Sequence, residues 1–202
     1  MKSAMTIDGQ LAAADGTSQW ITSPDALVDA HECRARVDAV MVGAGTVLTD
    51  DPALSVRLDG YTGPQPIPVV VAGRRPLPGD AAVFRRDPIV LAPRSLDLPG
   101  RMLVAPDESG DRVDLAAGLD MLADSGISRV LVEGGAGLLT ALLAGDLIDR
   151  GIVYYGQKLA GGVGRTLFNA EWATLADARA VKIVDVRLVG GDVRVEFEID
   201  AA

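Results

Sequence analysis

The sequence predicts an α/β protein that has a mostly parallel sheet and ends in an antiparallel hairpin. Short apolar runs such as 39–43 (AVMVG) and 67–73 (IPVVVAG) alternate with segments of helical pattern, which is typical of parallel strands covered on both faces. Near the C-terminus, Gly190-Gly191-Asp192 separates two stretches of alternating apolar and polar residues, which indicates a hairpin. No Ser/Gly tract, charge run or repeat marks a boundary, so we expect a single domain over residues 1–202.

The first helix is expected to begin at Pro24, with Ser23 as its N-cap. Asp25 stands in the first turn, where the helix dipole favours a carboxylate. An amphipathic helix needs an apolar stripe at helical spacing. The expected stripe consists of Leu27, Val28, Cys33 and Val37.

The remaining elements follow from length, periodicity and breakers. Residues 44–52 (AGTVLTDDP) predict a turn or short helix that Asp51-Pro52 stops. In 114–127, Leu115, Leu119 and Leu122 predict a helix that Gly126 ends. The expected buried strands are 39–43, 67–73, 88–93 and 128–133; an apolar helix is expected in 136–151, and strands in 152–159 and in the two halves of 181–200.

The charge balance disfavours some classes of partner. The formal net charge is −9, from 28 acidic and 19 basic residues, which argues against a general nucleic-acid or anionic-membrane binder. The basic residues are mostly arginine, which suits bidentate contacts to a ligand phosphate, although solvated arginines remain the alternative for any one position. No segment predicts a signal peptide or a membrane span, so we expect a cytoplasmic protein.

One cysteine and one histidine limit the chemistry further. Cys33 has no partner for an internal disulfide, which fits a reducing compartment. A Cys/His zinc site lacks ligands, and no metal site is expected. His31 and Cys33 are two residues apart, so on a helix they point to different faces, which argues against a nucleophile pair.

The segment 129–139 (RVLVEGGAGLL) places Glu133 at the end of an apolar run, directly before Gly134 and Gly135. An unpaired carboxylate there would be costly, so Glu133 should meet a partner or a ligand. The glycines leave bare backbone where a helix begins, which suits a phosphate. The spacing matches neither GxGxxG nor the P-loop, and an acidic cap with a tight glycine turn is the structural alternative.

Three stretches together resemble the riboflavin-biosynthesis pyrimidine reductase family. They are 2–22 (KSAMTIDGQLAAADGTSQWIT), 34–57 (RARVDAVMVGAGTVLTDDPALSVR) and 130–139 (VLVEGGAGLL), in the family's order and over nearly the whole chain. The resemblance implies a three-layer fold like dihydrofolate reductase. It also implies an oxidoreductase that uses NADPH to reduce 5-amino-6-(5-phosphoribosylamino)uracil to its ribityl form, by hydride transfer to the sugar C1′.

The resemblance also implies roles for particular residues. Lys2 and Glu133 would act at the reacting sugar, with Glu133 touching substrate. The substrate site would further contain Ser18, Arg34, Leu54 and Arg57, the arginines holding the phosphate. The turn 135–141 would bind the phosphates of the cofactor. The cofactor site would contain Ala4, Trp20, Thr46, Asp50, Gly73, Gly134, Gly135, Ala136, Gly137, Leu138 and Leu139. From the residues alone, Trp20 could equally be a core aromatic and Asp50 a capping residue.

Some positions depart from the family pattern. Only Met1 precedes Lys2, so we expect either a short first strand or an earlier natural start. Ala72-Gly73 replaces a strand end that is usually Asp, although Gly73, Arg74 and Arg75 could meet the cofactor's 2′-phosphate. Gly156-Gln157 stands in a region that usually shows an acidic residue and a proline. The Cys and His of a zinc deaminase are absent, so any reductase here is expected to be monofunctional.

Two rival functions stay open. One is a reductase of the same fold acting on a dihydropterin or another heterocycle, for which both Arg34 and Arg57 would have little use. The other is a module that binds a nucleotide without turnover. We also expect a homodimer, because 152–159 (IVYYGQKL) is apolar and rich in tyrosine and the family pairs through this sheet; the alternative is that Tyr154 and Tyr155 pack in the core.

Overall fold

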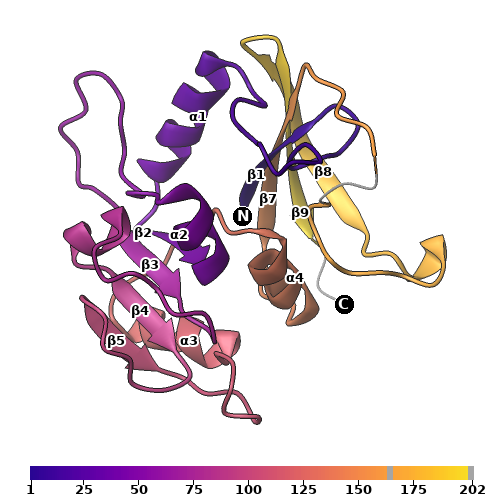
Figure 1. The fold of residues 1–202 in the computed structure, drawn as a ribbon. Coiled ribbons are helices and arrows are strands. Elements are labelled where there is room, and N and C mark those ends of the chain that lie inside the picture. The colour runs from indigo at the N-terminus through magenta and orange to yellow at the C-terminus, as the bar shows by residue number, and fades with distance from the viewer. Residues whose placement is uncertain (163–165, 200–202) are drawn as a thin grey trace. The chain divides into compact units, whose positions relative to one another are not determined.

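The computed structural model describes residues 1–162 and 166–199, and Asp200, the last residue of the predicted hairpin segment, lies outside them. The described strands form two sheets, one of five strands in the order β5-β4-β3-β2-β6 and one of four in the order β1-β7-β9-β8. Internal contacts divide the chain into two units (Figure 1): His31–Leu138, and Met1–Ala30 with Leu139–Ala202. The α/β class, with parallel strands and a C-terminal antiparallel hairpin, is confirmed.

The five-stranded sheet belongs to the unit His31–Leu138, and every strand pair in it is parallel. Each predicted buried strand is present, and β5 is an additional edge strand. The prediction missed β5 because it has only four residues and exposes Arg101 and Val104, so it lacks an apolar run. The strands are β2 (Ala39–Gly43), β3 (Ile67–Val71), β4 (Ile89–Ala92), β5 (Arg101–Val104) and β6 (Val130–Val132).

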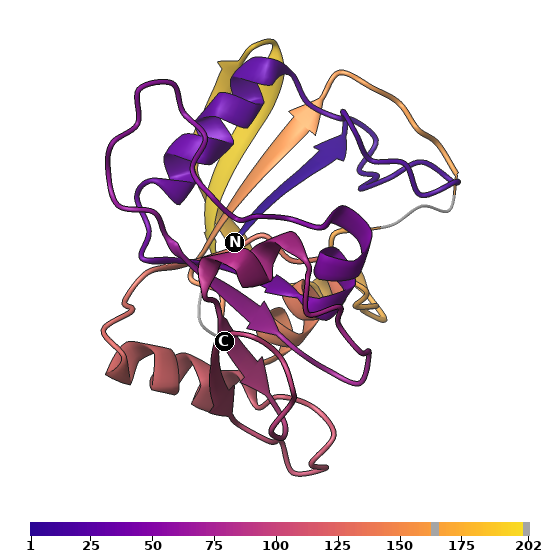
Figure 2. The same ribbon diagram turned by 60° about the vertical axis from the view of Figure 1, so that its left-hand side comes forward.

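Two α-helices and a 3-10 helix accompany this sheet (Figure 2). The helix α2 (Ala44–Asp50) follows β2 directly, and the helix α3 (Leu115–Asp124) begins at Asp114, whose side chain accepts a hydrogen bond from Ala117 N at 3.0 Å. Gly126 has a positive φ of 84°, which confirms the predicted helix stop. The 3-10 helix η1 spans Ala82–Arg86.

The core of this unit is aliphatic. Val40, Val42, Val70 and Val90 are fully buried, as expected for strands covered on both faces. Ala72 belongs to the same cluster and is 1% exposed. A carboxylate at position 72 would therefore need a buried partner, so an alanine there is consistent with its surroundings.

The four-stranded sheet belongs to the other unit. The strand β1 (Lys2–Thr6) pairs in parallel with β7 (Arg150–Gly156), and β9 (Asp192–Ile199) pairs antiparallel with both β7 and β8 (Val181–Val189). Gly190 and Gly191 have φ of 59° and 88°. Two successive positive φ values match a type I′ turn, so the predicted hairpin is confirmed. The unit also contains η2 (Leu175–Asp177) and residues 139–144 of α4 (Ala136–Ala144).

The helix α1 (Pro24–Arg34) is present where predicted, and Ser23 Oγ accepts a hydrogen bond from Ala26 N at 3.3 Å as its N-cap. The predicted apolar stripe is confirmed only in part: Cys33 and Val37 pack against the aliphatic core, but Val28 is 50% exposed, and Ala26 and Ala30 are the buried residues of the helix. The reason lies in the sheet face that the helix meets. That face is charged. Asp29, which lies between the two small alanines in the helix, forms ion pairs with Arg187 and Arg194 of the sheet.

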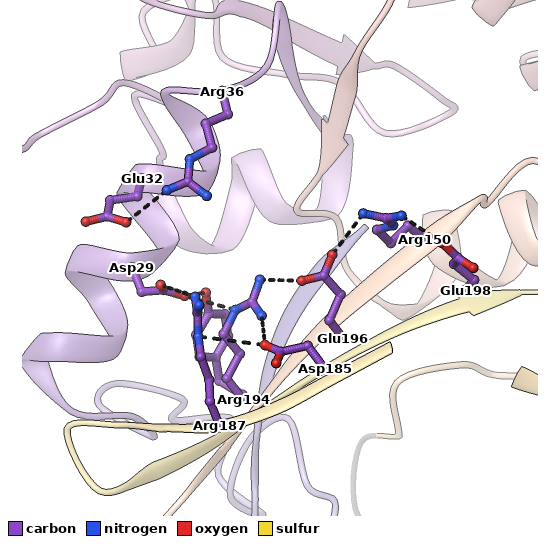
Figure 3. A network of polar contacts seen from close by, with 10 residues as sticks. Asp29, Glu32, Arg36, Arg150, Asp185, Arg187, Arg194, Glu196 and Glu198 are labelled. Atoms are coloured by element: carbon purple, nitrogen blue, oxygen red, sulfur yellow. Dashed lines mark hydrogen bonds and ion pairs between the residues drawn. The ribbon is translucent and has the colours of Figure 1, made fainter. Parts of the chain in front are cut away.

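A network of ion pairs fills this face (Figure 3). The side chain of Arg194 on β9 is only 5% exposed, and it lies 3.1 Å from Asp29 and 2.9 Å from Glu196. Asp185 on β8 lies 3.2 Å from the same guanidinium, and Tyr154 on β7 donates its hydroxyl to Asp29. Burial alone would lower the pKa of Arg194, but its contacts with Glu196 and Tyr154 raise it. Tyr154 is buried, as the core alternative expected.

Candidate functional site

Glu133 directly follows β6, and its backbone N–H donates to Met41 O on β2 at 2.9 Å, which holds the residue at the carboxyl end of the sheet. Its carboxylate accepts two hydrogen bonds from Arg34, from Nε at 2.6 Å and from Nη2 at 2.9 Å. Both side chains are largely buried, with 14% of Arg34 and 9% of Glu133 exposed. The residues alone predicted that Glu133 needs a partner, and Arg34 is one.

The third nitrogen of Arg34 points the other way. Its Nη1 donates to the backbone carbonyl of Ser55 at 2.9 Å, in the segment between α2 and β3. Arg57 lies two residues further on, and its backbone N–H donates to His31 Nδ1 at 3.2 Å. Of the residues expected at the substrate, Arg34 and Glu133 are therefore in contact at the end of the sheet, and Leu54 and Arg57 belong to the adjoining segment that Arg34 and His31 hold. Leu54 is only 2% exposed.

The turn between β6 and α4 approaches α2. The backbone N–H of Gly135 donates to Thr46 Oγ1 at 3.1 Å, so two residues expected at the cofactor are in contact. A Cβ at Gly134 would lie 2.8 Å from Cδ2 of Leu138, so a larger residue there would have to displace the Leu138 side chain. A Cβ at Gly137 would meet no atom within 4 Å, and Gly135 and Gly137 are both exposed.

Asp50 ends α2, and the capping residue is its neighbour Asp51, which has a φ of 41°. Asp50 is exposed as a residue, yet neighbouring protein atoms desolvate its carboxyl group and raise its pKa; the exposure limits the size of this effect. At the end of β3, a Cβ at Gly73 would meet no atom within 4 Å. Arg75 approaches α2, with its Nη1 3.9 Å from where a Cβ at Gly45 would lie, while Arg74 pairs with Asp111 at 2.7 Å.

The other expected site residues belong to the unit of the four-stranded sheet. Lys2 and Ala4 are alternate residues of β1, opposite Ile152 and Tyr154 of β7, so their side chains share one face. Ser18 and Trp20 lie on the loop between β1 and α1, and both are exposed. Trp20 is 59% exposed, which rules out the core alternative, and its carbonyl accepts a hydrogen bond from Lys158 Nζ at 2.5 Å.

Sequence reasoning missed three side chains that hold this region, namely His31, Gln65 and Arg86. Each contacts the backbone of residues 53–57 from another part of the chain. No local signal could have found them, because each contact joins residues at least nine positions apart and none of the three stands in a motif.

Gly156, one of the departures from the family pattern, has a local explanation. A Cβ at this position would lie 2.0 Å from the carbonyl oxygen of Ile21, so only glycine fits. Its neighbour Gln157 approaches the hairpin, since its Nε2 lies 2.5 Å from where a Cβ at Gly191 would lie.

The described residues hold neither a metal-binding cluster nor a membrane-crossing helix. Among residues 1–162 and 166–199, no group of three or more His, Cys, Asp or Glu side chains could hold a metal ion. Within the same residues, no helix has the length and apolar character that crossing a membrane requires.

Comparison with known proteins agrees with this arrangement. The model of the RibD C-terminal domain matches residues 1–194. The chain belongs to the RibD C-terminal domain family. The riboflavin biosynthesis protein RibD of Chlamydia muridarum is 37% identical over 210 residues, which cover 98% of this chain and 56% of that protein. The solved structure of Acinetobacter baumannii RibD, form 2, superimposes with a TM-score of 0.87 at 32% identity, covering 98% of this chain and 56% of that one.

This RibD C-terminal domain chain thus spans about half the length of the RibD proteins that it matches. One relative matches it along nearly its full length. The 2,5-diamino-6-ribosylamino-4(3H)-pyrimidinone 5′-phosphate reductase of Methanothermobacter thermautotrophicus is 33% identical over 209 residues, which cover 98% of this chain and 96% of that enzyme.

Proposed function

We propose that the chain is an NADPH-dependent reductase of riboflavin biosynthesis that converts 5-amino-6-(5-phosphoribosylamino)uracil to its ribityl form. The observation that carries the proposal is the group Arg34, Leu54, Arg57 and Glu133 at the carboxyl end of a parallel sheet, in a chain of the RibD C-terminal domain family. Ligands of open α/β sheets bind at this edge. A full-length relative whose name states pyrimidinone phosphate reduction supports the same reaction class.

The residues present fit a nicotinamide dinucleotide. The turn 134–137 exposes its backbone at Gly135 and Gly137, and it opens α4, whose N-terminal end favours an anion. Thr46 and Gly135 fix this turn against α2. When bound, NADPH would supply the hydride that reduces the sugar C1′. In this proposal, Trp20 and Ala4 also contact the cofactor, and Arg75 discriminates NADPH from NADH.

The substrate would be held through its charge and its ring. A guanidinium has five N–H groups, and the contacts with Glu133 and Ser55 use three of those on Arg34. The outward edge of Arg34, together with Arg57, is therefore suited to a phosphate. Because Glu133 is fixed by two hydrogen bonds, it would present its carboxylate to polar groups of the substrate in one orientation.

The proposal also gives roles to Lys2 and Ser18, which belong to the unit of the four-stranded sheet. Lys2 would handle the proton that accompanies reduction at the sugar, because an ammonium group can donate and then recover it. Ser18 would contact the substrate through its hydroxyl. A dihydropterin carries no phosphate, so Arg57 would matter little to a pterin reductase.

The test measures NADPH oxidation with the phosphoribosylaminouracil as substrate. The near-ultraviolet absorbance of NADPH monitors the reaction. Arg57→Ala and Glu133→Gln should each lower kcat/KM at least about a hundredfold, since each removes a charged contact. Arg36→Ala is the matched control, because Arg36 is exposed and forms an ion pair with the exposed Glu32 one helical turn away. Binding of NADPH without turnover of any pyrimidine would instead support a non-catalytic nucleotide-binding module.

A second substrate is favoured by one observation. The relative that the chain covers to 96% is named for reduction of the 2,5-diaminopyrimidinone phosphate, which still carries the amino group that the uracil has lost. Both compounds share the phosphoribosylamino group that Arg34 and Arg57 would bind. Parallel measurement of kcat/KM for the two compounds decides between them, since the preferred substrate should have the higher value.

We also propose that the chain works in the cytoplasm as a homodimer that pairs through β8. Within the described sheet β8 is an edge strand, and its large apolar side chains are exposed: Val181, Ile183, Val184, Val186 and Leu188. Exposed apolar rows on an edge strand are typical of surfaces that a second chain covers. The lone cysteine supports a reducing compartment.

A further inference from the structure

The segment 53–57 has an unusual means of support. It lies in no helix or strand, yet side chains from other parts of the unit His31–Leu138 hold five of its backbone polar groups. Two guanidinium groups donate to its carbonyls: Arg86 Nη1 to Ala53 O at 3.0 Å and Arg34 Nη1 to Ser55 O at 2.9 Å. The amide of Gln65 accepts a hydrogen bond from Val56 N at 2.7 Å and donates one to Val56 O at 3.2 Å. His31 Nδ1 accepts a hydrogen bond from Arg57 N at 3.2 Å.

Leu54 is the point where this support matters most. It has a φ of 54°, a conformation that L-residues other than glycine rarely adopt, and it is only 2% exposed. A left-handed backbone conformation is unfavourable for leucine, so the surrounding contacts must outweigh that strain. The carbonyls on either side of Leu54 are held by two guanidinium groups, those of Arg86 and Arg34.

Arg86 contacts both ends of the connection between α2 and β3. Its Nη1 donates to Ala53 O and its Nη2 to Pro66 O, both at 3.0 Å, so one planar group ties the start of the segment to the residue before β3. The side chain is partly buried at the end of η1. A lysine could not reproduce this fork, because an ammonium lacks the two parallel donors.

The charge of Arg86 is not balanced locally. The described residues give it no carboxylate partner, and its two acceptors are neutral carbonyls. Burial and, second, the charge of Arg34 lower the pKa of the Arg86 guanidinium. Arg34 shares its charge with Glu133, so an excess of positive charge remains here in a chain of net charge −9. A bound anion would offset this excess positive charge and so stabilise the group of side chains around Arg86.

We propose that Arg86 is a positioning residue for the substrate phosphate. It acts through segment 53–57, which it holds in the conformation that buries Leu54 and presents Arg57 to the phosphorylated sugar. The inference rests on the proposed function, because the phosphate belongs to that substrate. Arg86 therefore affects how the phosphate is bound, while the hydride step uses other residues.

The experiment compares the phosphorylated substrate with its dephosphorylated ribosylamino form in the full-length chain. Arg86→Met should raise the KM of the phosphorylated substrate about tenfold or more, with kcat changed less than about threefold and the KM of NADPH unchanged. The preference for the phosphorylated form over the dephosphorylated form should fall by the same factor. A residue with only a structural role would affect both forms equally.

Three further variants define the mechanism. Arg85→Met is the matched control, since Arg85 is the exposed neighbour of equal charge, and it should leave the preference unchanged. Gln65→Ala removes another support without changing charge, and it should also lower the preference. Arg86→Lys should recover little, because it restores the charge without the fork; full recovery would overturn the proposal in favour of a simple charge effect.

Two readouts separate this proposal from the proposed function. Hydrogen exchange at the amides of 54–57 should accelerate in Arg86→Met and in Gln65→Ala but not in Arg85→Met. Inorganic phosphate should raise the Tm of the wild-type chain more than that of Arg86→Met. These results would support the role of Arg86 even if no pyrimidine were reduced, whereas unchanged exchange and an unchanged phosphate effect would overturn it in an active enzyme. If Arg86→Met does not fold, Gln65→Ala carries the same tests.

Discussion

Glu133 and Arg34 are 99 residues apart in the chain, and they meet as a two-pronged ion pair with N–O distances of 2.6 and 2.9 Å. Arg34 ends α1 and Glu133 follows β6. The pair therefore fixes the end of a helix against the carboxyl end of the parallel sheet. It also gives the carboxylate one defined orientation, whatever molecule it meets.

Removal of either partner should lower the free energy of unfolding. Arg34→Met would leave the carboxylate of Glu133 buried without its main cation, and loss of one member of a buried pair costs about 3–5 kcal/mol in the free energy of unfolding. Urea denaturation at neutral pH measures this loss. The double variant Arg34→Met/Glu133→Gln should lose clearly less than the sum of the single variants.

The exposed pair Arg36–Glu32 provides the comparison. Its side chains are 71% and 46% exposed, so Arg36→Met should cost about 0.5 kcal/mol or less. Equal losses for Arg34→Met and Arg36→Met would contradict the view that burial makes the Arg34–Glu133 pair important.

Asp38 should make stability depend on pH in the acid range. The N–H of Arg129, followed by the hydroxyl and N–H of Ser128, lowers the pKa of its carboxyl. Because the folded pKa lies below the unfolded one of about 3.9, the ionised group stabilises the fold above that value. The stabilisation is lost as the pH falls through the folded pKa.

Asp38→Asn should therefore destabilise the chain by about 1 kcal/mol at pH 6, a value that allows for partial exposure of the group. The difference from wild type should shrink steadily below about pH 4. Urea denaturation at a series of pH values measures it. Asp120→Asn on α3 is the control, since the structure describes no hydrogen bond to that exposed carboxylate. A difference for Asp38→Asn that stays constant down to about pH 3 would speak against this account.

Elements with a strong local signal could be predicted from the sequence. The buried strands are continuous apolar runs, Ser23 and Gly126 mark helix ends, and the Gly190-Gly191 turn marks the hairpin. The placement of Asp29 on the covered face of α1 could not be predicted, because Tyr154, Arg187 and Arg194, all more than 100 residues away, hold its carboxylate there. The supports of 53–57 were missed for the same reason, since Gln65 and Arg86 act on backbone groups that carry no sequence signal.

Arg194 is expected to be essential to the unit of the four-stranded sheet. Arg194→Met would leave Asp29, Asp185 and Glu196 facing one another without the central cation, at a cost of about 3–5 kcal/mol. Lys182→Met tests an exposed cation of the same sheet, 70% exposed and 4.0 Å from Glu198, and should cost about 0.5 kcal/mol or less. Urea midpoints at an unchanged m-value report both. A small effect of Arg194→Met would mean that the acidic groups find water or other partners.

The apolar row on β8 predicts how the chain associates. Ile183, Val186 and Leu188 lie opposite Phe197, Val195 and Val193 of β9, so one face of the hairpin is apolar while Arg187 and Arg194 occupy the other. Leu188 and Val186 are 72% and 58% exposed, and a second copy of β8 would cover them.

Leu188→Glu should therefore shift the molar mass measured by light scattering from that of a dimer to that of a monomer, because a carboxylate would be buried at the interface. Leu175→Glu is the matched control, since Leu175 is 92% exposed in η2, outside the strand β8, and its replacement should leave the mass unchanged. A wild-type chain that stays monomeric at all concentrations would refute pairing through β8. A dimer that persists in Leu188→Glu would place the interface elsewhere.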